Sequence, residues 1–147
     1  MLLRLLAIGA LLVITAFAYA WWTRQQGRVR HVVVAGALTR ADLGVPPGAR
    51  GTVVVFSTPL CAKCPATKAM LSRLLENFEG VAQAEIDAAE RLDIARRFDI
   101  MRTPTVLVLN ANGVAVARMD GAPTAVQARE AIDALPPLSG YSICVGG

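Results

Sequence analysis

The chain has 147 residues, of which 54% are hydrophobic, and its formal net charge is +4 at pH 7. This length accommodates one domain and an accessory segment, and a mean hydropathy of +0.48 is high for a purely soluble protein. The positive charge is concentrated in residues 24–50 rather than in the segment expected to fold, which argues against nucleic-acid binding.

The hydrophobic excess lies near the N-terminus. Residues 5–23 are nineteen residues without a charge, a length that just spans a bilayer core as a helix. Trp21 and Trp22 stand where interfacial aromatic residues anchor such a helix. The alternative is a cleaved signal peptide with its cleavage site at residues 18–20, but its n-region has one Arg and two bulky Trp follow the cut. We therefore expect an uncleaved transmembrane anchor over residues 1–23.

A basic juxtamembrane segment, residues 24–50, follows the predicted anchor. It contains five Arg and one Asp, whereas residues 51–147 carry a net charge of −1. Arg24, Arg28 and Arg30 are candidates for contact with anionic lipid headgroups. The positive-inside rule favours the cytoplasmic face for the domain that follows. Thirteen of the fifteen basic residues are Arg, a compositional sign of a GC-rich bacterium, so the predicted location is a bacterial cell membrane, crossed once.

A cysteine pair follows a strand-like segment. Residues 52–56 read Thr-Val-Val-Val-Phe, which is typical of a strand, and residues 66–78 carry apolar side chains at helical spacing. Cys61 and Cys64 lie between them, where the N-terminus of a helix can stabilise a thiolate. Two cysteines at this spacing can form a small reversible disulfide.

The pair has two other interpretations: half of a zinc site, or inert core cysteines. Structural zinc normally requires four ligands. Beyond the pair the chain offers only Cys144 and His31 as soft donors, so no metal is expected. Inert core cysteines are disfavoured because both residues flank the predicted start of a helix. Cys144 itself is interpreted as an idle thiol, with an additional redox role as the alternative.

Five further elements are expected after the first helix. They are a strand at 81–87, a helix at 90–98, strands at 106–109 and 114–119 joined by a turn at 110–113, and a last helix at 123–135. Pro104 stands immediately before one of these strands and marks where it begins. Its peptide bond is either an ordinary trans bond or a cis bond in a tight turn.

Taken together, the cysteine pair, the later proline and the order of the elements resemble the thioredoxin family over residues 50–135. The resemblance implies an α/β thioredoxin-like fold, a central mixed sheet flanked by helices, here preceded by one N-terminal transmembrane helix. Residues 31–34 would be the first, peripheral strand of the family. The expected organisation is an anchor at 1–23, a juxtamembrane segment at 24–50, a thioredoxin-like domain at 51–135 and a flexible tail at 136–147.

The resemblance also implies a function, thiol–disulfide oxidoreduction. Cys61 would be the attacking thiolate and Cys64 the resolving thiol, and Lys63 would add a positive charge that lowers the pKa of Cys61. A cis Pro104 would leave the backbone of Thr103 free to pair with an extended substrate. The implied partners are protein disulfides or dithiols and a redox partner, a reductase or an oxidase. No cofactor is implied.

Four positions depart from the family pattern. Leu60, placed among the substrate contacts, replaces the usual Trp before the first Cys. Val55 replaces a buried Asp that assists proton transfer to and from the second Cys. A proline follows the second Cys directly as Pro65, and Ala69 stands where the family has its mid-helix proline. These departures affect the expected efficiency and reduction potential, and they motivate an alternative function, a non-catalytic docking or scaffold module at the membrane.

Overall fold

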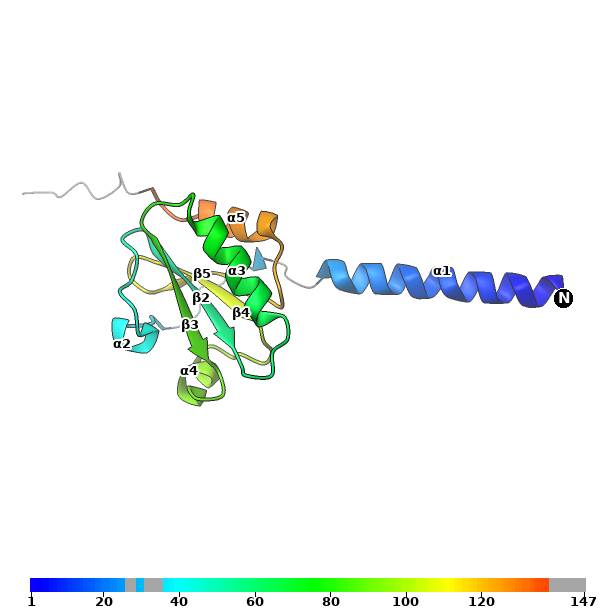
Figure 1. Ribbon diagram of the computed structural model, residues 1–147, viewed down its shortest axis with the longest axis horizontal. Coiled ribbons are helices and arrows are strands. Elements are labelled where there is room, and N and C mark those ends of the chain that lie inside the picture. Colours follow the sequence, from blue (N-terminus) through cyan, green and yellow to red (C-terminus); the bar gives the residue numbers. More distant parts are fainter. Residues whose placement is uncertain (26–28, 31–35, 138–147) are drawn as a thin grey trace, which may run out of the picture.

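A computed structural model describes residues 1–25, 29–30 and 36–137 (Figure 1). Its elements, in chain order, are α1 (Leu2–Gln25), β1 (Val29–Arg30), α2 (Arg40–Leu43), β2 (Gly51–Ser57), α3 (Cys64–Leu75), β3 (Val81–Asp87), α4 (Leu92–Arg97), β4 (Thr105–Asn110), β5 (Ala115–Asp120) and α5 (Ala125–Asp133). The strands form one mixed sheet in the order β1-β5-β4-β2-β3. The predicted thioredoxin-like α/β fold is thereby confirmed.

Strands β2 and β4 lie in the middle of the sheet because their sequences are apolar on both faces. Every residue of β2 is buried, and so are the first five of β4, as is usual for strands covered by helices on both sides. Strand β2 pairs in parallel with β3 and antiparallel with β4, and β4 pairs antiparallel with β5. Strand β3 is an edge strand in this order and is only partly buried.

Alternate side chains of the central strands enter two separate cores. On one face, Val53 and Val55 pack in a cluster with Leu71 of α3 and Ile132 of α5. On the other face, side chains of β2 and β4 pack with residues from α2 and α4, including the fully buried Phe98 that follows α4. Figure 1 shows the same division, with α3 and α5 over one face of the sheet and α2 and α4 at the other. The position expected for a buried Asp is therefore filled by an apolar residue, Val55, in the core beneath α3.

Two helices begin at capping boxes. Thr39 caps α2 and pairs reciprocally with Asp42, and Thr124 caps α5 and pairs with Gln127. In such a box each side chain satisfies a backbone N–H that the first turn of a helix leaves free. The backbone N–H of Thr39 is the main reason why the pKa of Asp42 lies below its usual range. The last helix consequently begins at Ala125, two residues after the start of the expected range.

Helix α1 occupies the predicted anchor and extends away from the sheet in Figure 1. Within residues 1–25, 29–30 and 36–137, however, no helix meets both the length and the hydropathy needed to cross a membrane. The predicted fold is thus confirmed for the α/β domain and not for a transmembrane helix.

Several predicted features lie outside the described residues. These are the strand expected at residues 31–34, His31, Arg28, Cys144 and most of the tail; the side chains of Arg24 and Arg30 are likewise not described.

Candidate active site

The cysteine pair forms a disulfide at the turn between β2 and α3. Cys61 and Cys64 are bonded, with their Cα atoms 5.5 Å apart. The turn is closed by two backbone hydrogen bonds, from the N–H of Cys61 to the carbonyl of Thr58 at 3.0 Å and from the N–H of Cys64 to the carbonyl of Cys61 at 3.3 Å. Pro65 fits the first turn of α3 because a residue there has no helical partner for its N–H. The sequence prediction of a disulfide-forming pair at a strand-to-helix turn is confirmed.

The two cysteines differ in how far they reach solvent. Cys61 is partly exposed, whereas Cys64 begins α3 and is only 3% exposed. An incoming disulfide can therefore reach Cys61, while Cys64 is held within bonding distance of Cys61 behind it. This asymmetry is what thiol–disulfide exchange requires of an attacking and a resolving thiol.

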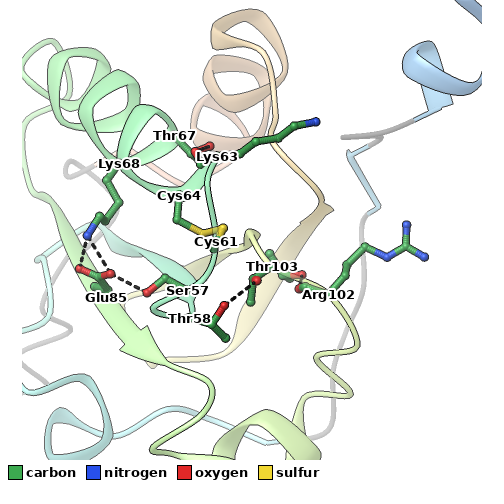
Figure 2. Close-up of a disulfide and its surroundings, with 11 residues drawn as sticks. Ser57, Thr58, Cys61, Lys63, Cys64, Thr67, Lys68, Glu85, Arg102 and Thr103 are labelled. Atoms are coloured by element: carbon green, nitrogen blue, oxygen red, sulfur yellow. Dashed lines mark hydrogen bonds and ion pairs between the residues drawn. A yellow bond between two sulfur atoms is a disulfide. The ribbon is translucent and has the colours of Figure 1, made fainter.

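The loop that ends at Pro104 lies against this turn. The Thr103–Pro104 peptide bond is cis, so the cis alternative raised by the sequence is confirmed. The hydroxyl groups of Thr58 and Thr103 are 3.2 Å apart and link the loop to the end of β2, as Figure 2 shows. Among the described residues, the backbone N–H and carbonyl of Thr103 have no hydrogen-bond partner. They are free to pair with an extended segment of another chain.

A cavity of about 400 Å³ opens beside this loop. Its lining includes Thr58, Thr103, Leu92, Met101, Arg96 and Arg102. Leu92 and Met101 are exposed apolar side chains, and the two Arg side chains have no ion-pair partner among the described residues. The cavity therefore offers both apolar surface and positive charge next to the backbone of Thr103.

The side chains of Leu60 and Lys63 project from the turn that holds the disulfide. Leu60 is 97% exposed and stands immediately before Cys61. Lys63 is the N-cap residue of α3 and makes no capping hydrogen bond with its side chain. In Figure 2 its ammonium group points away from the sulfur atoms. The roles proposed for these two residues stay predictions.

A charged network beneath α3 was not found from the sequence. Lys68 of α3 donates hydrogen bonds to both carboxylate oxygens of Glu85 on β3, at 2.8 and 2.7 Å, and the Ser57 hydroxyl donates to Glu85 Oε1 at 2.5 Å (Figure 2). The hydrogen bonds from Lys68 and then from Ser57 hold the pKa of Glu85 below its usual range. The one sequence feature that could have indicated this network is that Lys68 stands one helical turn after Cys64. The pairing with Glu85 depends on the sheet register.

Asp87 has a structural role at the end of β3. It is the last residue of β3, and its carboxylate accepts hydrogen bonds from the backbone N–H groups of Ala89 at 2.8 Å and Glu90 at 3.4 Å. Within the part of the chain that the structure describes, no three His, Cys, Asp or Glu side chains are grouped so that they could hold a metal ion.

The sequence model of the thioredoxin family matches residues 45–134, which is more than half of the chain. The chain belongs to the thioredoxin family. The match contains the disulfide, the cis proline and four of the five strands. Together, the thioredoxin domain and the Cys61–Cys64 disulfide support thiol–disulfide oxidoreductase activity. A comparison with curated proteins found no significant match.

Solved structures of thioredoxins share the fold at low sequence identity. Mitochondrial thioredoxin 3 of Saccharomyces cerevisiae is 21% identical, with a TM-score of 0.52 over 57% of this chain and 77% of its own. Thioredoxin-2 of the malaria parasite, described as a component of its protein secretion machinery, is 20% identical, with a TM-score of 0.54 over 63% and 89%. Oxidised thioredoxin from Plasmodium falciparum is 19% identical, with a TM-score of 0.50 over 57% and 79%. At these identities the likeness concerns the fold alone.

Proposed function

We propose that this thioredoxin-family protein is attached to a membrane and exchanges its Cys61–Cys64 dithiol or disulfide with protein substrates. The observation that carries the redox part is the asymmetric disulfide, with a reachable Cys61 in front of a buried Cys64, opposite a cis-proline loop whose Thr103 backbone is unpaired. The membrane part rests on helix α1 and is argued separately below.

In the reducing direction, the Cys61 thiolate attacks one sulfur of a substrate disulfide. The substrate S–S bond breaks, a Cys61–substrate disulfide forms, and the released substrate thiolate takes up a proton. Cys64 then loses its proton and attacks the sulfur of Cys61, which closes the Cys61–Cys64 bond and releases the second substrate thiolate, and that thiolate also takes up a proton. Two electrons and two protons pass from the dithiol to the substrate, and a dithiol donor restores the reduced pair. In the opposite direction the same disulfide oxidises a substrate dithiol.

The substrate contacts follow from the surroundings of the sulfur atoms. An extended substrate segment pairs with the backbone of Thr103, next to Pro104, and its neighbouring side chains contact Leu60 and the cavity beside Met101. Backbone pairing places the attacked sulfur over Cys61 without selecting a particular sequence. The same arrangement therefore suits protein disulfides in general.

The redox part is tested by turnover. The full chain, with dithiothreitol as the electron donor, is expected to accelerate the reduction of insulin disulfides, and Cys61→Ser is expected to abolish the acceleration. Cys144→Ser is the matched control, because it removes a thiol outside the pair and is expected to retain turnover. Equal rates for wild type and Cys61→Ser would refute the proposal. Absence of turnover together with partner capture that survives loss of both cysteines would instead support the docking-module alternative.

The membrane part rests on the apolar surface of α1. Its described side chains between Leu6 and Trp22 are exposed, including the large ones of Leu12 and Phe17. No charged residue interrupts residues 5–23. Exposed apolar surface of this extent is stabilised by contact with lipid, so α1 is proposed as the attachment to a bacterial membrane. The Arg-rich segment that follows favours the cytoplasmic face for the domain, with Arg24, Arg28 and Arg30 near lipid headgroups.

Attachment is tested by cell fractionation followed by alkaline carbonate extraction. The wild type is expected to stay in the membrane pellet, and the double variant Leu12→Lys/Phe17→Lys is expected to move to the soluble fraction. Leu60→Lys is the matched control, since it charges an equally exposed apolar residue outside α1. A soluble wild type would remove the membrane part and leave the redox part intact. Labelling of cysteines in intact cells then decides which face carries the domain.

A further inference from the structure

Two structural connections place the ion pair between Lys68 and Glu85 close to the cysteine pair. Along α3, Lys68 is four residues after Cys64, so the two side chains leave neighbouring positions on the same side of the helix. Across the sheet, Glu85 accepts a hydrogen bond from Ser57, the last residue of β2 before the turn that carries Cys61. Figure 2 shows the three side chains beside the disulfide.

The Lys68–Glu85 pair is partly exposed to solvent. The side chains of Lys68 and Glu85 are 34% and 42% exposed, and Ser57 is 6% exposed. Water screens partly buried charges less than fully exposed ones. With both carboxylate oxygens within 2.8 Å of the ammonium nitrogen, the two opposite charges largely cancel at the cysteines. Removal of either partner would leave a full charge of one sign near the sulfur atoms.

We propose that Lys68 and Glu85 form a balanced charge pair whose mutual neutralisation keeps the ionisation of the Cys61–Cys64 dithiol, and with it the reduction potential of the two cysteines, from being shifted by either charge alone. This inference builds on the redox part of the proposed function, because it concerns the same two cysteines. Lys68 and Glu85 act through their electrostatic field, without contact with the substrate, so they are positioning residues. The reduced state carries the thiolate, so a nearby cation stabilises the reduced state and a nearby anion destabilises it.

Other charged groups around the pair stay constant when Lys68 or Glu85 is changed. Lys63 points away from the sulfur atoms, and Arg102 lies on the proline loop on the opposite side of the disulfide (Figure 2). Asp87, two residues after Glu85 on β3, uses its carboxylate to accept two backbone hydrogen bonds. A change at either member of the Lys68–Glu85 pair therefore isolates the effect of one charge.

The experiment measures thiol ionisation in the reduced full chain by following thiolate absorbance with pH. Glu85→Gln keeps the shape of the side chain and leaves the Lys68 ammonium unbalanced, so the pKa of Cys61 is expected to fall by up to about one unit. Lys68→Met leaves the Glu85 carboxylate unbalanced, so the same pKa is expected to rise by a similar amount. The double variant is expected to return close to the wild-type value, because no net charge remains.

A matched control separates charge from structure. Ser72 of α3 donates a hydrogen bond to Gln83 of β3 at 2.8 Å, an uncharged link between the same two elements one turn further from the cysteines. Ser72→Ala weakens this link without changing a charge, and it is expected to leave the thiol pKa where it is. The folded state of each variant is checked by far-UV circular dichroism before titration.

A second readout is the redox equilibrium of each variant with a reference dithiol couple, at a pH above the pKa of Cys61. The reduced form is expected to gain up to about tenfold in Glu85→Gln and to lose a similar factor in Lys68→Met. Shifts in the same direction for both variants, no shift in either, or an equal shift in Ser72→Ala would overturn the inference. None of these measurements uses a protein substrate, so their failure is distinguishable from loss of insulin reduction.

Discussion

Reduction of the Cys61–Cys64 bond should lower the free energy of unfolding of the domain by only about 2 kcal/mol. The bond joins residues at a sequence separation of 3. For so short a loop, the chain-entropy relation gives about 6 cal/mol/K, or about 2 kcal/mol at 25 °C. By thermodynamic linkage the same quantity is the difference between the reduction potentials of the pair in the folded and unfolded chain, about 40 mV for two electrons. Both redox states should therefore stay folded, as a reaction cycle requires.

Urea unfolding of the full chain with and without dithiothreitol measures this difference. Far-UV circular dichroism is the suitable probe, because both Trp residues lie in α1 and do not report on the domain. The double variant Cys61→Ala/Cys64→Ala is the control and should not respond to the reductant. Unfolding of the reduced wild type in the absence of urea, or a loss above about 4 kcal/mol, would refute the reasoning, since the bond would then be structural.

Three further predictions concern the core, the ion pair and the cavity. Phe98→Ala should lower the free energy of unfolding by about 3–5 kcal/mol, measured in urea, because Phe98 is fully buried in the core that includes α4; a loss below about 1 kcal/mol would contradict that packing. Because the folded state lowers the pKa of Glu85, its contribution to stability is present above the usual pKa of a glutamate side chain and is lost as pH falls through the folded pKa. Glu85→Gln should therefore reduce the loss of unfolding free energy at acidic pH by at most about 1 kcal/mol, given the exposure of the pair. An unchanged loss would show that the Lys68–Glu85 ion pair does not stabilise the folded state. Arg102→Glu should lower kcat/KM for a disulfide peptide with acidic flanks more than for one with basic flanks, and equal effects would show that Arg102 does not contact substrate.

Much of the domain could be predicted because its local patterns agree with its tertiary structure. Strand β3 has the expected bounds, Val81–Asp87, and the cysteine pair lies at the expected turn. Helix α3 begins at Cys64, two residues before the expected range, because the apolar spacing starts only after the first turn, which contains Pro65. It also ends at Leu75, before the expected limit at 78. Patterns locate the middle of an element better than its ends.

The surroundings of the disulfide were less accessible to sequence reasoning. The partnership of Glu85 with Lys68 and Ser57 joins residues from β3, α3 and β2, and only the strand register brings them together. The direction of Lys63 depends on the local backbone at the start of α3, which composition does not specify. The run of uncharged residues indicated a helix at α1, whereas membrane contact of that helix stays a proposal, because the structure contains no lipid.

The central claim is that Cys61 is the nucleophile and Cys64 resolves the intermediate, and trapping tests it most directly. A full-length Cys64→Ser/Cys144→Ser variant is reduced, mixed with a disulfide peptide and analysed by mass spectrometry under non-reducing conditions. The account predicts a stable mixed disulfide located at Cys61. It also predicts that the matching Cys61→Ser/Cys144→Ser variant accumulates far less adduct, because Cys64 is buried. Adduct formation predominantly at Cys64, or no adduct at Cys61 from a chain whose wild type turns over the same peptide, would contradict the assigned roles.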